Sequence, residues 1–181
     1  MNTKLKIGIV GGSIAGCSAA ILLLRAGHDV VVYERSRGTL VGRGGGIATT
    51  SAVLNDLIDQ DIIDADFPNF TTTTMPFTGK RSPTDRLGHT AWEFPLDLQA
   101  FHWSALWNNL RKRVPNEVYR QGQPVVSAQM TDDASVRVQI EGGEEAVFDL
   151  VLFADGYQSL GRQSLFPEFE LSYRGYMLWR G

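Results

Sequence analysis

The chain of 181 residues is 43% hydrophobic and 20% charged, a balance typical of a soluble globular protein with one domain, or with one domain and the start of another. Its formal net charge of −3 provides no basic surface for nucleic acid, so we expect no partner of that class. The single cysteine, Cys17, cannot form an internal disulfide, so we expect a reducing compartment, the cytoplasm.

The first apolar segment has two interpretations. No charged residue occurs from Ile7 to Leu24, and Lys4 and Lys6 precede the run, as in a signal peptide or a membrane span. The run is interrupted by small residues at Gly8, Gly11, Gly12, Ser13 and Gly16. A buried strand, a glycine turn and a helix explain these interruptions better, so we expect no membrane segment.

A strand–helix–strand unit is predicted at the N-terminus. Lys4–Val10 has the composition of a buried strand, and Ile14–Ala26 is an Ala- and Leu-rich helix that Gly27 terminates. Val30–Glu34 is a second apolar strand, and a helical connection of this length makes it parallel to the first. The sequence therefore predicts an α/β fold with a parallel sheet.

The middle of the chain is less regular. A glycine-rich loop, a short helix, two strands with a turn near Gly79, and an amphipathic helix are expected in turn, at Gly38–Gly46, Thr50–Gln60, Thr71–Thr78, Thr90–Phe94 and Phe101–Val114. The apolar side of the last helix consists of Trp103, Leu106, Trp107 and Leu110.

Strands are predicted in the last third. Glu117–Arg120 is a candidate third parallel strand, and Leu150–Ala154 is a further apolar strand. An antiparallel meander is expected between them, at Val125–Thr131, Ser135–Ile140 and Glu145–Phe148.

The C-terminal end has an unusual sequence. Tyr173–Trp179 begins another apolar strand, and the chain stops within it at Gly181. We therefore expect a fragment or a truncated chain. Such a chain would self-associate through the unprotected strand near Met177 and Trp179.

The string GGSIAG, from Gly11 to Gly16, joins the first strand to the first helix, where a dinucleotide-binding fingerprint lies. Gly11 allows the tight turn, and Gly16 lets the helix pack close to the strand. The helix N-terminus then presents free N–H groups and the positive end of its dipole to a pyrophosphate. Ser13 occupies the position of the usual middle glycine, and its small hydroxyl can donate to a phosphate oxygen.

Glu34 ends the second strand about twenty residues further on, where a carboxylate accepts hydrogen bonds from ribose hydroxyls. A carboxylate also repels a 2′-phosphate, which argues against NADP in this site. The alternative is that the glycines only form a turn and that Glu34 is a solvated strand end.

Four segments together resemble the FAD-dependent aromatic-ring monooxygenases of the para-hydroxybenzoate hydroxylase type: IVGGSIAG, VVYER, GGGI and FADGYQS. The serine in the fingerprint and the ending RGYMLWRG are most similar to the 2,6-dihydroxypyridine hydroxylase branch. The resemblance covers the whole chain as the N-terminal part of such an enzyme, although Ser51 to Arg120 match only in pattern. It implies a Rossmann-like FAD-binding domain with a parallel sheet and an antiparallel β-meander, plus the start of a substrate-domain sheet at residues 68–98 and 171–181.

The resemblance implies several FAD-binding residues. The pyrophosphate would be held by Gly11, Ser13, Ile14, Ala15 and Gly16. The adenosine ribose would bind to Glu34, with Arg35 along the adenine side and Val125 against the adenine.

A second set of residues would lie near the flavin ring. Gly45, Gly46 and Ile47 match the family's loop that passes close to the ring, where glycine allows the backbone to approach it. Two positions depart from the family pattern. Trp103 stands where many members have an arginine that contacts the flavin side chain, and Thr50 stands where many have glutamine.

Asp155 and Gly156 match the family's Asp-Gly motif, which helps to hold FAD and is also assigned to NAD(P)H use. The same dipeptide is an ordinary turn in other contexts. Ser159 and Arg162 match the tail of the motif, but a solvated helix face explains them equally well. Arg43 either meets an anionic cofactor or substrate or is a free loop arginine.

The implied activity uses NAD(P)H to reduce the flavin, which then reacts with O2 to place one oxygen atom on an electron-rich aromatic or N-heteroaromatic ring. The cofactor carries this chemistry, so no catalytic residue is named. The histidines suggest neither a nucleophile nor a metal site: His28, His89 and His102. Two alternatives stay open, an NAD-dependent dehydrogenase and a non-catalytic nucleotide-binding fragment. The chain alone is expected to be inactive, because the family's second flavin motif would lie beyond Gly181.

Overall fold

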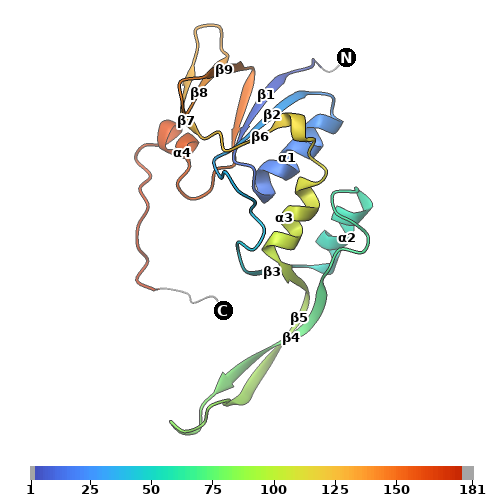
Figure 1. The fold of residues 1–181 in the computed structure, drawn as a ribbon. Helices are drawn as coiled ribbons and strands as arrows, with labels where there is room; N and C mark the ends of the chain where they lie inside the picture. The colour runs from blue at the N-terminus through green and yellow to red at the C-terminus, as the bar shows by residue number, and fades with distance from the viewer. Residues whose placement is uncertain (1–2, 177–181) are drawn as a thin grey trace.

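The computed structural model describes residues 3–176, which form an α/β body with a long hairpin projecting from it (Figure 1). The centre of the body is a parallel sheet in the order β10-β1-β2-β6. Its strands are β1 (Lys6–Val10), β2 (Asp29–Glu34), β6 (Tyr119–Gln121) and β10 (Leu150–Phe153). The predicted strand–helix–strand unit and parallel sheet are confirmed.

Two helices cover one face of the parallel sheet, α1 (Ile14–Arg25) and α3 (Trp103–Arg111). Alternation along the strands explains this packing, because Ile7 and Ile9 of β1 face the helices and are almost completely buried. The opposite face carries the antiparallel meander, as predicted, with β7 (Val125–Met130), β8 (Val136–Ile140) and β9 (Glu145–Phe148).

Gly8 shows why the meander can pack so closely. A Cβ at this position would lie 2.9 Å from the ring of Phe148, which is buried in the core between the sheet and the meander.

The apolar run from Ile7 to Leu24 is divided between β1, the glycine turn and α1. Among residues 3–176, no helix has the length and apolar character needed to cross a membrane.

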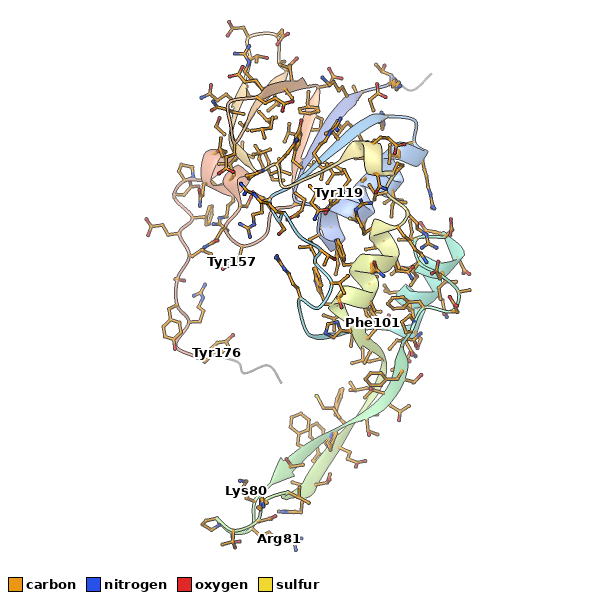
Figure 2. The ribbon with its side chains drawn as sticks, viewed as in Figure 1. Lys80, Arg81, Phe101, Tyr119, Tyr157 and Tyr176 are labelled. Carbon is orange, nitrogen blue, oxygen red and sulfur yellow. The ribbon has the colours of Figure 1, made fainter. Side chains whose placement is uncertain are left out.

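A second sheet has the order β3-β5-β4, with β3 (Gly46–Thr49), β5 (His89–His102) and β4 (Phe70–Gly79). The β4–β5 hairpin extends away from the body, with Lys80 and Arg81 at its tip (Figure 2). Its aromatic residues away from the body are exposed and pack on each other, as in the stacked pair Phe77–Trp92. Helix α2 (Ser51–Asp59) lies between β3 and β4 in the sequence.

The remaining elements are a short 3-10 turn (Asn116–Val118) before β6 and helix α4 (Leu160–Leu165) after β10. From α4 the chain continues without regular structure past Tyr173 to Tyr176 (Figure 2). The strand expected at Tyr173–Trp179 is therefore absent over 173–176, and the rest of that range lies outside the described residues.

Three predicted boundaries were wrong. The strand expected at Thr90–Phe94 continues to His102, because a register shift lets the β4–β5 ladder accommodate Pro95 opposite Thr74. The following helix accordingly begins at Trp103 rather than Phe101, and the His102 side chain caps its N-terminus. The third parallel strand lies a little later than Glu117–Arg120, because residues 116–118 form the 3-10 turn.

A cluster of ion pairs joins α3 to the loop after α2. Asp64 contacts Lys112 and also accepts a hydrogen bond from Arg113 at 2.8 Å. These bonds lower the pKa of Asp64 from 3.8 to about 2, and the bond from Lys112 has the largest effect. The pKa is lower in the folded state, so ionised Asp64 stabilises the fold above about pH 4. This stabilisation disappears as the pH falls from about 4 to 2.

We therefore expect Asp64→Asn to reduce the fall in the thermal unfolding midpoint between pH 4 and pH 2. The midpoint is measured by circular dichroism at each pH. The control is Asp66→Asn, at an exposed position in the same loop that joins no ion pair within residues 3–176. Equal acid sensitivity of the wild type and Asp64→Asn would contradict the assignment.

Candidate dinucleotide-binding site

A cleft of about 650 Å³ opens where β1, β2 and β10 end, the edge at which open parallel sheets bind ligands. Most of the residues predicted to bind a cofactor line this cleft: Gly11, Ser13, Ile14, Ala15, Glu34, Arg35, Val125, Asp155 and Gly156. They come from four separate parts of the chain, so the fold brings together residues that are far apart in the sequence.

The glycine turn after β1 has no room for side chains. Gly11 has a φ of 103°, and a Cβ there would lie 2.4 Å from the carbonyl oxygen of Ala154. A Cβ on Gly16 would lie 1.8 Å from the carbonyl oxygen of Gly11. Gly16 does not line the cleft, and its role is to let α1 pack directly against the turn.

The N-terminus of α1 faces the cleft. Ser13 is the N-cap residue, and its side chain makes no capping hydrogen bond, so its hydroxyl is available to a ligand. No acidic residue lies in the first turn, so nothing there competes for the positive end of the helix dipole. Ser13 has an extended backbone, φ −83° and ψ −161°, which any residue adopts. Its conformation therefore explains why serine is acceptable where a glycine is usual.

Glu34 is buried at the end of β2, with 7% of its surface exposed. Its Oε2 accepts a hydrogen bond from the Gly12 N–H at 2.8 Å, and its Oε1 accepts one from the Ser36 N–H at 2.7 Å. A carboxylate has about four acceptor sites, so both oxygens can still accept from ligand hydroxyls. The interpretation of Glu34 as a solvated strand end is therefore wrong.

Asp155 follows β10 on the opposite side of the glycine turn. Its Oδ2 accepts a hydrogen bond from the Leu160 N–H at 2.7 Å, which supports the turn into α4. Its Oδ1 is buried and has no hydrogen-bond partner within residues 3–176. A buried acceptor without a partner is costly, and this one lies in the cleft lining, where a ligand hydroxyl would satisfy it. Gly156 has a φ of 84°, so the dipeptide also forms a turn.

The tail of the Asp-Gly motif lies outside the cleft lining. The Ser159 hydroxyl caps α4 by accepting a hydrogen bond from the Arg162 N–H at 3.1 Å. The Arg162 side chain donates to the Tyr157 carbonyl oxygen. Both residues therefore have structural contacts in α4 and its preceding turn.

The predicted flavin loop lies beside the cleft rather than in its lining. Gly46 and Ile47 belong to β3 and pair with His102 and Phe101 of β5. Gly45 holds the start of α3 through a hydrogen bond from the Trp103 N–H to its carbonyl oxygen, at 2.9 Å. These three residues support one wall of the cleft, and the side chains and backbone that line that wall come from neighbouring residues.

That wall contains residues outside the predicted set of cofactor-binding residues. Gly44, with a φ of 79°, packs against the Trp103 side chain, and both line the cleft. The Trp103 ring lies parallel to that of Trp107, with 6.4 Å between centroids. Arg43 also lines the cleft and donates to the Ser36 hydroxyl at 3.1 Å. The helical periodicity placed both tryptophans on the apolar side of α3, and the resemblance singled out only Trp103, as a departure from the family's arginine.

Cys17 is completely buried under the turn. Burial raises the pKa of its thiol from 9.0 to about 12, so the reactive thiolate is absent at neutral pH. Cys17 is therefore a packing residue of the core. Within residues 3–176, no group of His, Cys, Asp and Glu side chains has the arrangement of a metal site.

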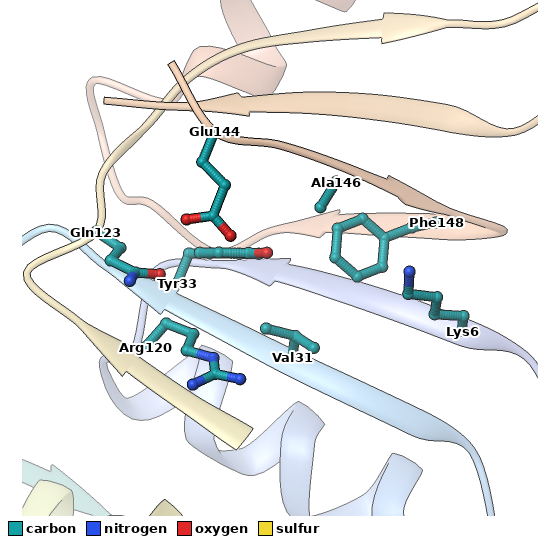
Figure 3. Close-up of a pocket in the computed structure, with 8 residues that line it drawn as sticks. All are labelled: Lys6, Val31, Tyr33, Arg120, Gln123, Glu144, Ala146 and Phe148. Carbon is teal, nitrogen blue, oxygen red and sulfur yellow. The ribbon is translucent and has the colours of Figure 1, made fainter. Parts of the chain in front are cut away.

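A second hollow, of about 270 Å³, lies between the parallel sheet and the meander. Figure 3 shows its mixed lining, with the Tyr33 and Phe148 rings beside charged groups from Lys6, Arg120 and Glu144. It contains no glycine turn and no helix N-terminus. The larger cleft is therefore the better candidate for a dinucleotide.

The glycine turn, the buried acid after β2 and the parallel sheet together define a Rossmann-like dinucleotide-binding domain. The family model for NAD(P)-binding Rossmann-like domains matches residues 9–72. The chain is also 30% identical, over 97% of its length, to 2,6-dihydroxypyridine 3-monooxygenase of Paenarthrobacter nicotinovorans. The resemblance inferred from the four motif segments is thereby confirmed.

Solved structures agree with this likeness. The 2,6-dihydroxypyridine-3-hydroxylase of Arthrobacter nicotinovorans superimposes with a TM-score of 0.82 at 28% identity, over 97% of this chain and 42% of that one. Klebsiella pneumoniae HpxO, solved in complex with FAD, has the same fold, with a TM-score of 0.70 at 21% identity over 88% of this chain and 42% of that one. This chain spans 42% of the length of the Paenarthrobacter relative.

Proposed function

We propose that this chain is the FAD-binding part of a flavin-dependent, NAD(P)H-using monooxygenase that hydroxylates an electron-rich aromatic or N-heteroaromatic ring. One observation carries the proposal. A single cleft combines three features: the uncapped N-terminus of α1, the buried Glu34 carboxylate at the position that binds ribose, and the Asp155 carboxylate, one oxygen of which has no hydrogen-bond partner within residues 3–176. A nicotinamide dinucleotide needs the first two features, and the third suits the hydroxylated chain that joins the flavin to its phosphates.

The cleft lining fits such a ligand from end to end. The backbone N–H groups at the start of α1, with Ser13, would hold the pyrophosphate. Glu34 would accept hydrogen bonds from the adenosine ribose, and Val125 would contact the adenine. Asp155 would accept a hydrogen bond at Oδ1 from a hydroxyl on the flavin side.

Two arginines give the adenosine side of the cleft a positive charge. Arg35 and Arg43 both line it, next to the buried Glu34. Their charges favour a ligand with two phosphate groups. A 2′-phosphate would lie beside the Glu34 carboxylate, so NADP suits this cleft poorly and NADPH serves only as a transient reductant elsewhere.

When bound, FAD supplies the redox chemistry that takes a hydride from NAD(P)H and activates O2 for transfer of one oxygen atom to the ring. The residues of this chain bind and orient the cofactor. We assign no catalytic residue, because no side chain in the cleft forms a nucleophile–base pair.

We assign the projecting hairpin, residues 68–98, together with residues 171–181 to a substrate domain. Exposed aromatic side chains along β4 and β5 support this assignment, because such a surface needs a covering partner. The remainder of the chain forms the FAD-binding domain. In this proposal the full-length enzyme acts in the cytoplasm on a small aromatic substrate and O2, without nucleic-acid or membrane partners.

An NAD-dependent dehydrogenase is the second candidate, favoured by the match of residues 9–72 to NAD(P)-binding Rossmann-like domains. This match begins at Ile9, near the end of β1, includes α1 and β2, and does not reach Asp155. A titration followed by tryptophan fluorescence separates the two candidates, since Trp103 lines the cleft. FAD should quench this fluorescence at lower concentration than NAD. Saturation by NAD without any response to FAD would contradict the proposal.

The same titration tests Asp155. We expect Asp155→Ala to weaken FAD binding about tenfold, the effect of losing one charge-assisted hydrogen bond, and to leave AMP binding unchanged. The control is Asp132→Ala, at an exposed position in the β7–β8 turn. FAD affinity equal to that of the wild type would exclude contact between the cofactor and Asp155.

A further inference from the structure

The carbonyl oxygen of Gly12, beneath the glycine turn, accepts hydrogen bonds from several side chains. It accepts a hydrogen bond from Trp107 Nε1 at 2.9 Å and another from Tyr119 Oη at 2.9 Å. The Cys17 thiol is a third donor, at 3.3 Å. These donors come from α3, β6 and α1. A carbonyl oxygen has two lone pairs, so its hydrogen-bonding capacity is filled.

The planar peptide bond between Gly12 and Ser13 determines the direction of the Ser13 N–H group. The Gly12 carbonyl and the Ser13 N–H belong to one planar unit, and the structure contains no cis peptide within residues 3–176. In a trans peptide the C=O and N–H point in opposite directions. Because the carbonyl points into the core, the Ser13 N–H points away from the core, on the side where Ser13 lines the cleft.

Building on the proposed function, we propose that Trp107 and Tyr119 are positioning residues that aim the Ser13 N–H at the phosphates of the bound dinucleotide. Glycine is the residue whose flanking peptides rotate most freely, so a turn beginning Gly11-Gly12 needs external contacts to hold one orientation. A rotated peptide would present the Gly12 carbonyl oxygen to the phosphates, where like partial charges repel.

The surroundings keep both donors in place. Trp107 and Tyr119 are each only 6% exposed. The Trp107 ring stacks on Trp103, and the Arg111 guanidinium lies 4.0 Å from the centre of the Tyr119 ring. Burial raises the pKa of the Tyr119 hydroxyl, which therefore remains a donor throughout the physiological range.

The peptide group that precedes Gly12 is held by a residue of the cleft lining. The Gly12 N–H donates to Glu34, so both peptide groups that flank Gly12 have assigned partners. A Cβ at Gly12 would lie 2.3 Å from Tyr119 Oη, which explains why the donor can approach only a glycine. The phosphate-binding turn is thus set by residues about one hundred positions further along the chain.

The test compares the wild-type chain with the double variant Trp107→Phe/Tyr119→Phe, which keeps an aromatic ring at each position and removes both donors. The matched control is Trp92→Phe/Tyr173→Phe, with the same chemical changes at exposed positions outside the cleft lining. Calorimetric titration with ADP and with adenosine gives the two affinities. We expect ADP binding to weaken at least tenfold and adenosine binding to stay within twofold of the wild type.

A ligand-free measurement accompanies the titration. The ¹⁵N shift of the Ser13 amide and the ¹³C shift of the Gly12 carbonyl should both change in the double variant and not in the control. Unchanged shifts, unchanged ADP affinity, or equal losses for ADP and adenosine would each overturn the inference. A wild-type chain that binds neither ADP nor FAD contradicts the proposed function instead, and the NMR comparison then decides this inference alone.

Discussion

Gly16→Ala should be the most damaging small substitution in the chain. Its Cβ would lie 1.8 Å from the Gly11 carbonyl oxygen, and this contact is with backbone that cannot rotate away. Helix α1 would have to move off the turn, and its start carries the phosphate-binding N–H groups. We expect the free energy of unfolding to fall by about 3 kcal/mol, the upper end for overpacking.

Cofactor binding should decrease in the same variant. A displacement of the helix start by about 1 Å is enough for a roughly 100-fold loss where function depends on aligned groups. Chemical denaturation and a fluorescence titration with FAD measure the two effects. Gly38→Ala is the control, because a Cβ there meets no atom within 4 Å. Stability and affinity equal to those of the control would contradict the packing argument.

Removal of the Glu34 carboxylate should have the second largest effect. Glu34→Ala leaves the Gly12 and Ser36 N–H groups without their acceptors, at a cost of about 2–4 kcal/mol in unfolding free energy. AMP binding should weaken as well, since the ribose loses its acceptor. Glu168→Ala, at an exposed position after α4, is the control for loss of a negative charge.

Glu34→Gln separates the charge of this residue from its shape. The amide retains one acceptor oxygen, but its NH₂ must face one of the two N–H donors, so we expect an intermediate loss of stability. It also removes the negative charge next to the ribose. AMP with an added 2′-phosphate should therefore bind this variant better, relative to AMP, than it binds the wild type. An unchanged ratio would show that the carboxylate does not lie beside the 2′ position.

The features predicted correctly from sequence are those that local chemistry determines. The β1–α1–β2 unit, from Lys6 to Glu34, follows from a buried strand, a glycine turn and an Ala-rich helix that are close together in the sequence. Glu34 was identified from its position at the end of the second strand and Asp155 from its match to the family's Asp-Gly motif, and the parallel topology brings both to one edge of the sheet.

The features that were missed depend on contacts between distant segments. The extension of β5 to His102 follows from its pairing with β3 and β4, and Pro95 alone suggests the opposite. Trp107 has the spacing of a core residue, and it is buried, but its indole N–H also holds the glycine turn. No local pattern distinguishes a packed tryptophan from one that donates to a residue 95 positions earlier.

The central claim is that this cleft binds FAD in preference to NAD. Equilibrium dialysis of the wild-type chain against equal concentrations of the two cofactors measures this preference directly, with flavin absorbance and nicotinamide assay as the readouts. The account predicts that FAD occupies close to one site per chain, while NAD stays near its free concentration. Retention of NAD with no bound FAD would contradict it.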